Sequence, residues 1–153
     1  MPFKSIINKQ ARHEYEVLDT LEAGIVLTGP EVKSIRKGAV NLRDSHVRII
    51  NNQAFIIGLS ISPYPNARQE DYDPKQTRKL LLHRRQINTL TGKLEQKNLT
   101  LVPLKIYQKN NRFKLELGLA RGKKQYQKKE TKKRRDIERD ARRMVKDHIR
   151  YKG

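Results

Sequence analysis

The sequence predicts a mainly β fold with short helices, arranged as a small closed barrel and followed by a basic C-terminal tail. Short strand-like runs recur between turn signals, which is the pattern of a small sheet or barrel. Aromatic residues make up only 6% of the chain, and no internal repeat is visible. The oligonucleotide-binding type of barrel matches best in size, and a split β-sheet with helices on one side is the alternative.

The strand-like runs are separated by residues that favour turns. Asn51-Asn52 and Asn110-Asn111 each lie between two runs, and because Asn tolerates a positive φ, both pairs predict tight hairpins. The expected strands are Tyr15–Asp19, Gly24–Leu27, Val47–Ile50, Ala54–Leu59, Leu80–Leu82, Leu99–Tyr107 and Phe113–Leu119.

Two helices are expected between these strands. Pro30 at the first turn and Gly38 after the last turn predict a short helix over 31–36. A longer helix is expected over 84–93, where apolar residues recur along one side. The segment 62–77 is rich in Pro, Asn, Asp and Gln, which indicates a long surface loop.

The positive charge is concentrated in the C-terminal part of the chain. The 153 residues carry a formal net charge of +19, and residues 121–153 hold 15 Lys and Arg against 5 Asp and Glu. Those residues include only seven apolar side chains, too few to offset an ordering entropy of about 1–2 kcal/mol per residue. We therefore expect a folded β-barrel domain at 1–121 and a basic tail at 122–153 that is disordered when alone.

The tail carries one apolar stripe. Ile137, Ala141, Met144, Val145 and Ile149 follow one another at spacings of 4, 3, 1 and 4, which places them on one face of an α-helix. We expect this helix to form on a polyanion that screens its cations, as arginine-rich segments do on RNA. The alternatives are a chance stripe in a solvated coil and a membrane-surface helix, although the stripe lacks the Trp, Phe and Leu typical of the latter.

Composition narrows the classes of function. A charge of +19 favours a polyanionic partner, nucleic acid first and an anionic membrane second. Without Cys the chain has no disulfides, thiolate metal sites or cysteine nucleophiles. The four histidines lack zinc-site spacing, and Asp71 and Asp73 are explained more simply by a turn than by Mg²⁺. No apolar run reaches the ~18 residues of a membrane span. We expect a cytoplasmic RNA-binding protein without enzyme activity, metal or cofactor.

The first candidate RNA contacts precede the first expected strand. Asn8, Arg12 and His13 offer amide, basic and imidazole groups ahead of Tyr15. Such groups hold phosphates or stack on bases. The alternative is a solvated N-terminal arm with Tyr15 in the core.

The second group lies in the short helix. Lys33 and Arg36 are three residues apart and can face one phosphate strand, while Val32 and Ile35 face the core. Glu31 has three interpretations. It stabilises the helix N-terminus through the macrodipole, it pairs with a neighbouring cation, or it accepts hydrogen bonds from base amino groups.

The third group lies where the domain meets the tail. Its members are Gly122, Lys123, Lys124, Tyr126, Lys128 and Lys129. Base–aromatic stacking contributes ~1–3 kcal/mol, and lysines supply salt-dependent phosphate contacts. We therefore expect Tyr126 to stack on a base, with an isolated surface tyrosine as the alternative.

Taken in order, these residues resemble the SsrA-binding protein (small protein B) family of bacteria over nearly the whole chain. The matching motifs are Asn8-Lys9-x-Ala11-Arg12-His13-x-Tyr15, Glu22-Ala23-Gly24-Ile25, Gly29-x-Glu31-Val32-Lys33-Ser34-Ile35-Arg36, Asn41-Leu42-x-Asp44-Ser45, Ile61-Ser62-Pro63-Tyr64, Asp73-Pro74, Arg78-Lys79-Leu80-Leu81-Leu82-His83, Val102-Pro103-Leu104 and Gly122-Lys123-Lys124. Each tripeptide alone is a weak signal, whereas the ordered set is a strong one. Gln127 and Lys129 stand where the family usually has Asp and Arg, and Gln76 stands where Arg is common.

The resemblance implies an RNA-binding adaptor in ribosome rescue. A member of this family binds the tRNA-like domain of transfer-messenger RNA, or SsrA RNA, and enters a ribosome stalled on a message without a stop codon. The barrel takes the place of the missing anticodon arm. The tail lies as a helix in the decoding site and the empty message channel, against small-subunit ribosomal RNA.

The resemblance also implies site residues. The transfer-messenger RNA face comprises Asn8, His13, Glu31, Lys33 and Arg36, and the decoding-site contacts are Lys123, Lys124, Tyr126, Lys128 and Lys129. We expect a monomer on its RNA, with no membrane partner. A general ribosomal-RNA-binding protein is the alternative function, and an RNA-modifying or RNA-cleaving enzyme is the third.

Overall fold

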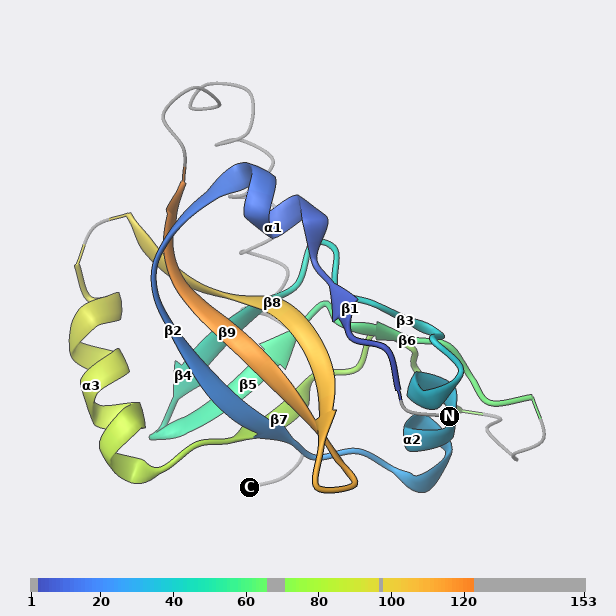
Figure 1. Cartoon of the computed structure of the whole chain (residues 1–153). Helices are drawn as coiled ribbons and strands as arrows, with labels where there is room; N and C mark the ends of the chain where they lie inside the picture. The colour runs from blue at the N-terminus through green and yellow to red at the C-terminus, as the bar shows by residue number, and fades with distance from the viewer. Residues whose placement is uncertain (1–2, 66–70, 97, 123–153) are drawn as a thin grey trace.

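A computed structural model describes residues 3–65, 71–96 and 98–122 of the chain (Figure 1). Over these residues the protein is mainly β with a few short helices, as the sequence predicts. The strands are β1 (Ile6–Ile7), β2 (Tyr15–Ile25), β3 (Val40–Asn41), β4 (His46–Ile50), β5 (Gln53–Ile57), β6 (Ser60–Ile61), β7 (Arg78–Leu81), β8 (Leu99–Lys109) and β9 (Arg112–Gly122). The helices are α1 (Lys9–Glu14), α2 (Gly29–Arg36) and α3 (Arg84–Leu94).

Six strands pair in a continuous order. β8 pairs with β4, β4 with β5, β5 with β7, β7 with β2 and β2 with β9, and β9 pairs again with β8. All of these pairings are antiparallel, and the link between β4 and β8 consists of one residue pair, Val47 with Leu101. β1 pairs with a later part of β8, and β3 and β6 form a separate two-stranded sheet.

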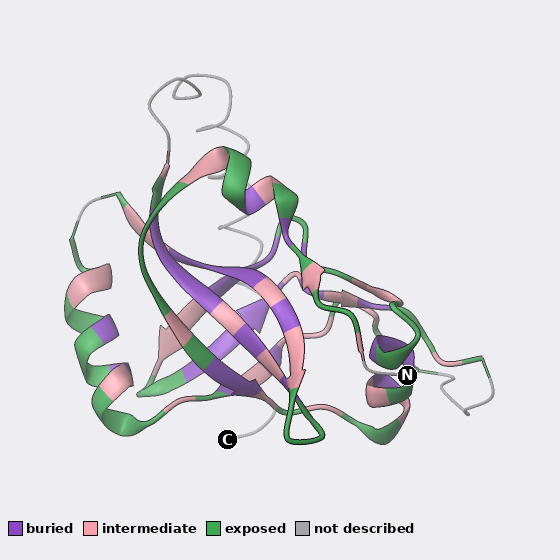
Figure 2. Cartoon of the chain, viewed as in Figure 1, coloured by how far each residue is buried: buried purple, intermediate pink, exposed green. Residues whose placement is uncertain are grey.

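The main apolar core lies among these six strands. Ile56 and Leu115 are fully buried there, and α3 adds Leu90 to the same cluster. Figure 2 shows buried stretches along β8 and β9. A smaller cluster joins Ala11 of α1 to Ala120 of β9, together with apolar residues of β8. α1 therefore packs on the sheet through a single small side chain, which leaves most of its surface exposed.

Both asparagine pairs form the expected hairpin turns. Asn51 and Asn52 have φ angles of 52° and 61°, and Asn110 and Asn111 have φ angles of 51° and 62°. Two consecutive positive φ angles match the right-handed twist of the strands on either side, and Asn tolerates them better than other non-glycine residues. The turns join β4 to β5 and β8 to β9.

Two features near the N-terminus differ from the sequence prediction. The runs Tyr15–Asp19 and Gly24–Leu27 do not form separate strands, because β2 is one strand that pairs with β9 along its length. The pairing shifts register between Val17 and Asp19. The residues before Tyr15 form a helix, α1, which was not predicted from the sequence. Six residues make fewer than two turns, too short for helical periodicity to appear in the sequence.

Candidate nucleic-acid interface

Asn8 is a structural residue that begins α1. Its side chain is buried, and its Oδ1 accepts a hydrogen bond from the backbone N–H of Ala11 at 3.2 Å. Its Nδ2 donates to the carbonyls of Pro103, at 2.8 Å, and Leu42, at 3.3 Å. Asn8 therefore caps the helix and fixes it to β8 and to the segment after β3. Its amide groups are occupied within the protein.

α1 presents the predicted basic residues on its outer surface. Arg12 and His13 are exposed, whereas Tyr15 is half-buried against the Ala11 cluster. The Nε2 of Gln10 donates to the Oδ1 of Asp44 at 2.6 Å, and its Oε1 accepts from the backbone N–H of Asp44 at 2.7 Å. These two bonds hold the outer side of α1 against the loop that follows β3.

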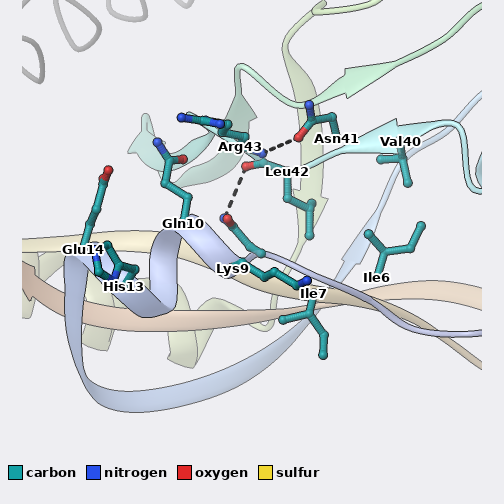
Figure 3. Close-up of a pocket in the computed structure, with 11 residues that line it drawn as sticks. Ile6, Ile7, Lys9, Gln10, His13, Glu14, Val40, Asn41, Leu42 and Arg43 are labelled. Carbon is teal, nitrogen blue, oxygen red and sulfur yellow. Dashed lines mark hydrogen bonds between the residues drawn. The ribbon is translucent and has the colours of Figure 1, made fainter.

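A depression of about 440 Å³ lies between α1, β1 and the segment from Val40 to Arg43 (Figure 3). Its lining is apolar where Ile6 and Val40 approach each other. Lys9 and His13 from α1 line it on one side, and Arg43 lines it on the other. Two sequence segments about 30 residues apart thus bring basic groups around one concave surface.

α2 carries the second predicted basic group. Thr28 caps this helix by accepting from the backbone N–H of Glu31, and Gly38, with a φ of 78°, ends it. Ile35 is fully buried, whereas Lys33 and Arg36 are exposed, as the spacing predicts.

Glu31 is buried at the start of α2, with 2% of its surface exposed. Its Oε1 accepts from the backbone N–H of Thr28 at 3.0 Å. Its Oε2 accepts from the Nε of Arg78 at 2.7 Å, from the Nε2 of Gln76 at 3.2 Å and from the hydroxyl of Tyr72 at 3.0 Å. The ion pair agrees with the second interpretation of Glu31. The third, a contact with a base, requires an accessible carboxylate, and this one lies inside the protein.

Arg78 connects this carboxylate to the loop before β7. It is also buried, and its Nη1 donates to the carbonyl of Leu59 at 2.7 Å and to that of Gln76 at 3.1 Å. Its Nη2 donates to the carbonyl of Pro74 at 3.0 Å. The guanidinium therefore satisfies backbone groups on both sides of the loop while it neutralises Glu31 of α2.

The environment sets the charge state of this cluster. Burial alone raises the pKa of Glu31, but the backbone N–H of Thr28 and the guanidinium of Arg78 stabilise the carboxylate more strongly, so the pKa lies below the usual 4.5. Burial, together with the hydrogen bond to Glu31, raises the pKa of Tyr72 to about 12. At neutral pH the carboxylate is charged, the phenol is neutral, and Glu31 and Arg78 balance each other.

A second depression, of about 670 Å³, adjoins the first. Lys4, Arg36 and Lys37 line it, and Ile6 lines both depressions. We call the two depressions together the β1 groove. Its basic residues are Lys4, Lys9, His13, Arg36, Lys37 and Arg43. The β1 groove is therefore lined both by His13 of α1 and by Arg36 of α2, two of the residues that the sequence predicts.

The structure places the predicted residues in three different settings. His13 and Arg36 line the β1 groove, whereas Arg12 and Lys33 are exposed on the same helices without lining it. Asn8 lines the groove while its side chain is buried, and Glu31 does not line it.

The predicted tail contacts extend beyond the described residues. Gly122 is the last residue of β9, where it pairs with Tyr15. Lys123, Lys124, Tyr126, Lys128 and Lys129 lie outside the described residues, as does the expected helical stripe. The tail therefore begins next to the junction of α1 and β2.

Sequence reasoning missed Lys4, Lys37 and Arg43 as candidate contacts. Their positions along the chain carry no distinguishing signal, because only the pairing of β1 with β8 and the placement of β3 bring them together. Among the described residues, no group of His, Cys, Asp or Glu is suited to hold a metal ion. No helix in the described part has the length and apolar character needed to cross a membrane.

A model of the SmpB protein family matches residues 5–147 of this chain. The chain belongs to the SmpB protein family. The match includes both helices that carry the β1 groove and extends through most of the tail. The resemblance found from the motifs is thus confirmed.

Individual relatives agree with the family assignment. The SsrA-binding protein of Gloeothece citriformis is 56% identical over 140 residues, covering 91% of this chain and 90% of that protein. The SsrA-binding protein of Oleidesulfovibrio alaskensis is 53% identical over 141 residues, covering 92% and 91%. A chain of a solved structure described as "tmRNA-SmpB: a journey to the center of the bacterial ribosome" is 48% identical, with a TM-score of 0.68, over 82% of this chain and 88% of that one.

Proposed function

We propose that this chain is an RNA-binding adaptor that binds the tRNA-like domain of transfer-messenger RNA and delivers it to stalled ribosomes for trans-translation. The observation that carries the proposal is the β1 groove, a concave basic surface in a member of the SmpB family. Its relatives are named SsrA-binding proteins, and the similar solved structure is described as tmRNA-SmpB in the bacterial ribosome.

The body supplies the surface for transfer-messenger RNA. Lys and Arg in a concave surface focus positive potential and replace the counterions of phosphates. Arg12, His13, Lys33 and Arg36 contact this RNA from α1 and α2. Asn8 and Glu31 act from inside the protein, because each holds in place one of the helices that carry these residues. The ring of strand pairings supports a closed oligonucleotide-binding-type barrel for the body, a fold that binds nucleic acid through one face and its loops.

The tail binds the ribosome. The tail, 122–153, begins beside α1 at the end of β9, and its residues after Gly122 occupy the decoding site and the empty message channel as a basic helix. Lys123, Lys124, Lys128 and Lys129 neutralise phosphates of small-subunit ribosomal RNA, and Tyr126 stacks on one of its bases. The protein acts in the cytoplasm as a monomer on its RNA and carries out no catalytic step.

Selective binding tests this proposal. The intact chain is titrated with the tRNA-like domain of transfer-messenger RNA and with an RNA duplex of equal length, at one fixed, moderate salt concentration. We expect clear preference for the tRNA-like RNA, because a shaped groove recognises the fold of the RNA as well as its charge. Equal affinity for both RNAs would favour a general ribosomal-RNA-binding protein, and turnover of the RNA would favour an enzyme.

A matched pair of variants locates the interface. Arg36→Gln removes a charge from the β1 groove, and Arg85→Gln removes the same charge from the exposed surface of α3. Only Arg36→Gln should weaken binding and lower the dependence of log affinity on log salt, by roughly 0.7–0.9 for each phosphate that is no longer neutralised. Equal effects of the two variants would place the interface elsewhere.

A further inference from the structure

Two lysines of the α2 region lie close to the same aromatic ring. The Nζ of Lys33 lies 5.5 Å from the centroid of the Tyr64 ring, and the Nζ of Lys37 lies 5.0 Å from it. The two lysines are four residues apart and therefore stand on the same side of the helix. Tyr64 comes from the loop after β6, so the ring reaches these lysines from a different part of the chain.

The start of that loop is anchored beside α2. The backbone N–H of Ser62 donates to the carbonyl of Ala39 at 3.0 Å, directly after the pairing of Ile61 with Val40. The backbone N–H of Ile61 donates to the carbonyl of Pro74 at 2.9 Å. Tyr64 lies two residues after Ser62 and is half-buried. The chain is therefore anchored to the sheet two residues before Tyr64.

This arrangement concentrates positive charge. Two cations at positions i and i+4 repel each other, which is unfavourable unless something nearby is negative. The face of an aromatic ring provides a weak attraction for each ammonium group, because its quadrupole is negative there. Each ammonium still has donors that point away from the ring. A bound anion would therefore relieve the repulsion and use donors that are already positioned.

We propose that Lys33, Lys37 and Tyr64 form a phosphate-binding site for the RNA backbone, in which Tyr64 is a positioning residue that holds both lysines on its ring. The inference rests on the proposed RNA-binding function and adds one contact residue, Lys37, and one positioning residue, Tyr64. Lys37 also lines the β1 groove, so the site continues the groove onto the outer face of α2. The ring is approached by two ammonium groups, which favours a phosphate ligand over a base stacked on Tyr64.

The test measures the affinity of the intact chain for the tRNA-like domain at several salt concentrations. Tyr64→Leu removes the ring without changing the charge, and it should weaken binding about threefold to tenfold, because the ring no longer holds the two lysines where they neutralise a phosphate. The salt slope should also fall, by roughly 0.7–0.9 for each phosphate that the lysines no longer neutralise. Tyr64→Phe keeps the ring and should bind as the natural protein does.

Tyr107→Leu is the matched control. Lys105 also lies 5.5 Å from a tyrosine ring, that of Tyr107, but the carboxylate of Glu116 lies 3.7 Å from this lysine and neutralises it within the protein. Removing the Tyr107 ring should leave the salt slope unchanged. An unchanged slope for Tyr64→Leu as well would overturn the inference.

A double-mutant cycle separates positioning from direct contact. In a Lys33→Gln, Lys37→Gln background, Tyr64→Leu should have no further effect on RNA affinity. If it weakens binding there as strongly as in the natural protein, Tyr64 contacts RNA by itself and the positioning role is wrong. If the natural protein shows no preference for the tRNA-like RNA, the proposed function is contradicted. If it shows the preference but Tyr64→Leu leaves the salt slope unchanged, only the inference about Tyr64 fails.

Discussion

Arg78 and Glu31 are 47 positions apart in the sequence and form an ion pair inside the protein, with the Nη2 of Arg78 2.7 Å from the Oε2 of Glu31. Both side chains are 2% exposed. The pair joins the N-terminal end of α2 to the loop that leads into β7. The pair therefore helps to hold α2, which carries Lys33 and Arg36, against the loop before β7.

Removing the cation of this pair should strongly destabilise the fold. Arg78→Met leaves the Glu31 carboxylate buried without its main counter-charge, at a cost of about 3–5 kcal/mol in the free energy of unfolding, measured in urea. Adding Glu31→Gln should recover part of the loss, since Gln can keep the capping box with Thr28. Asp19→Asn breaks the exposed pair with Lys93 and should cost less than about 1 kcal/mol. Equal losses for Arg78→Met and Asp19→Asn would contradict this role.

Stability should fall at acid pH through Glu31. Its folded-state pKa lies below the usual 4.5, so the unfolded chain binds this proton more readily than the folded protein. The stabilisation that the charged Glu31 gives the folded protein is fully present above about pH 4.5, and it is lost as the pH falls through the folded-state pKa of Glu31. Urea unfolding between pH 3 and 6 should show a flatter pH dependence in Glu31→Gln.

Glu22 offers the comparison for this pH dependence. The hydrogen bond from Tyr107 lowers the pKa of Glu22 as well, but Glu22 lies on the surface, where solvent screens its interactions. Glu22→Gln should therefore flatten the curve less than Glu31→Gln. The opposite order would mean that the buried pair does not control acid stability.

Asn8→Ala should weaken both the fold and RNA binding. The variant loses the cap of α1 and removes the side-chain donor to the carbonyl of Pro103, at a cost of about 2–3 kcal/mol measured by thermal or urea unfolding. The carbonyl of Leu42 keeps its hydrogen bonds from Ser45. RNA affinity should fall even where the variant is folded, because α1 carries Arg12 and His13. Asn41→Ala removes one exposed hydrogen bond, which the Oδ1 of Asn41 accepts from the backbone N–H of Arg43, and should cost less than about 1 kcal/mol. A loss for Asn41→Ala as large as that for Asn8→Ala would argue against the capping role.

Truncation after Gly122 should separate the two proposed RNA contacts. The cut preserves β9 and its pairing with Tyr15. Affinity for the isolated tRNA-like domain should stay within several-fold of that of the intact chain, whereas rescue of ribosomes stalled on truncated messages should be abolished. Failure to bind the isolated RNA would show that the tail belongs to the same interface as the body.

The ring of Tyr126 should matter more than its hydroxyl. Tyr126→Ala removes the stacking surface and should impair rescue, while Tyr126→Phe keeps the surface and should leave rescue largely intact. Both variants should bind the isolated tRNA-like domain as the intact chain does. Full rescue activity in Tyr126→Ala would rule out the stacking role.

Short-range features followed from the sequence by itself. The hairpins at Asn51-Asn52 and Asn110-Asn111, and the start and end of α2 at Pro30 and Gly38, are encoded by residues whose backbone preferences act locally. The excess of positive charge, its concentration after residue 120 and the ordered motifs of the family are also properties of the linear chain.

The tertiary structure alone decided which polar residues lie inside and which basic residues share a surface. Glu31 and Asn8 look like surface residues in the sequence, but Arg78 and the carbonyl of Pro103, both distant along the chain, compensate their burial. The β1 groove and the Lys37–Tyr64 contact likewise join separate segments. Periodicity tells which side of an element is apolar but not which element packs against it, so these contacts emerge only when the strands have paired.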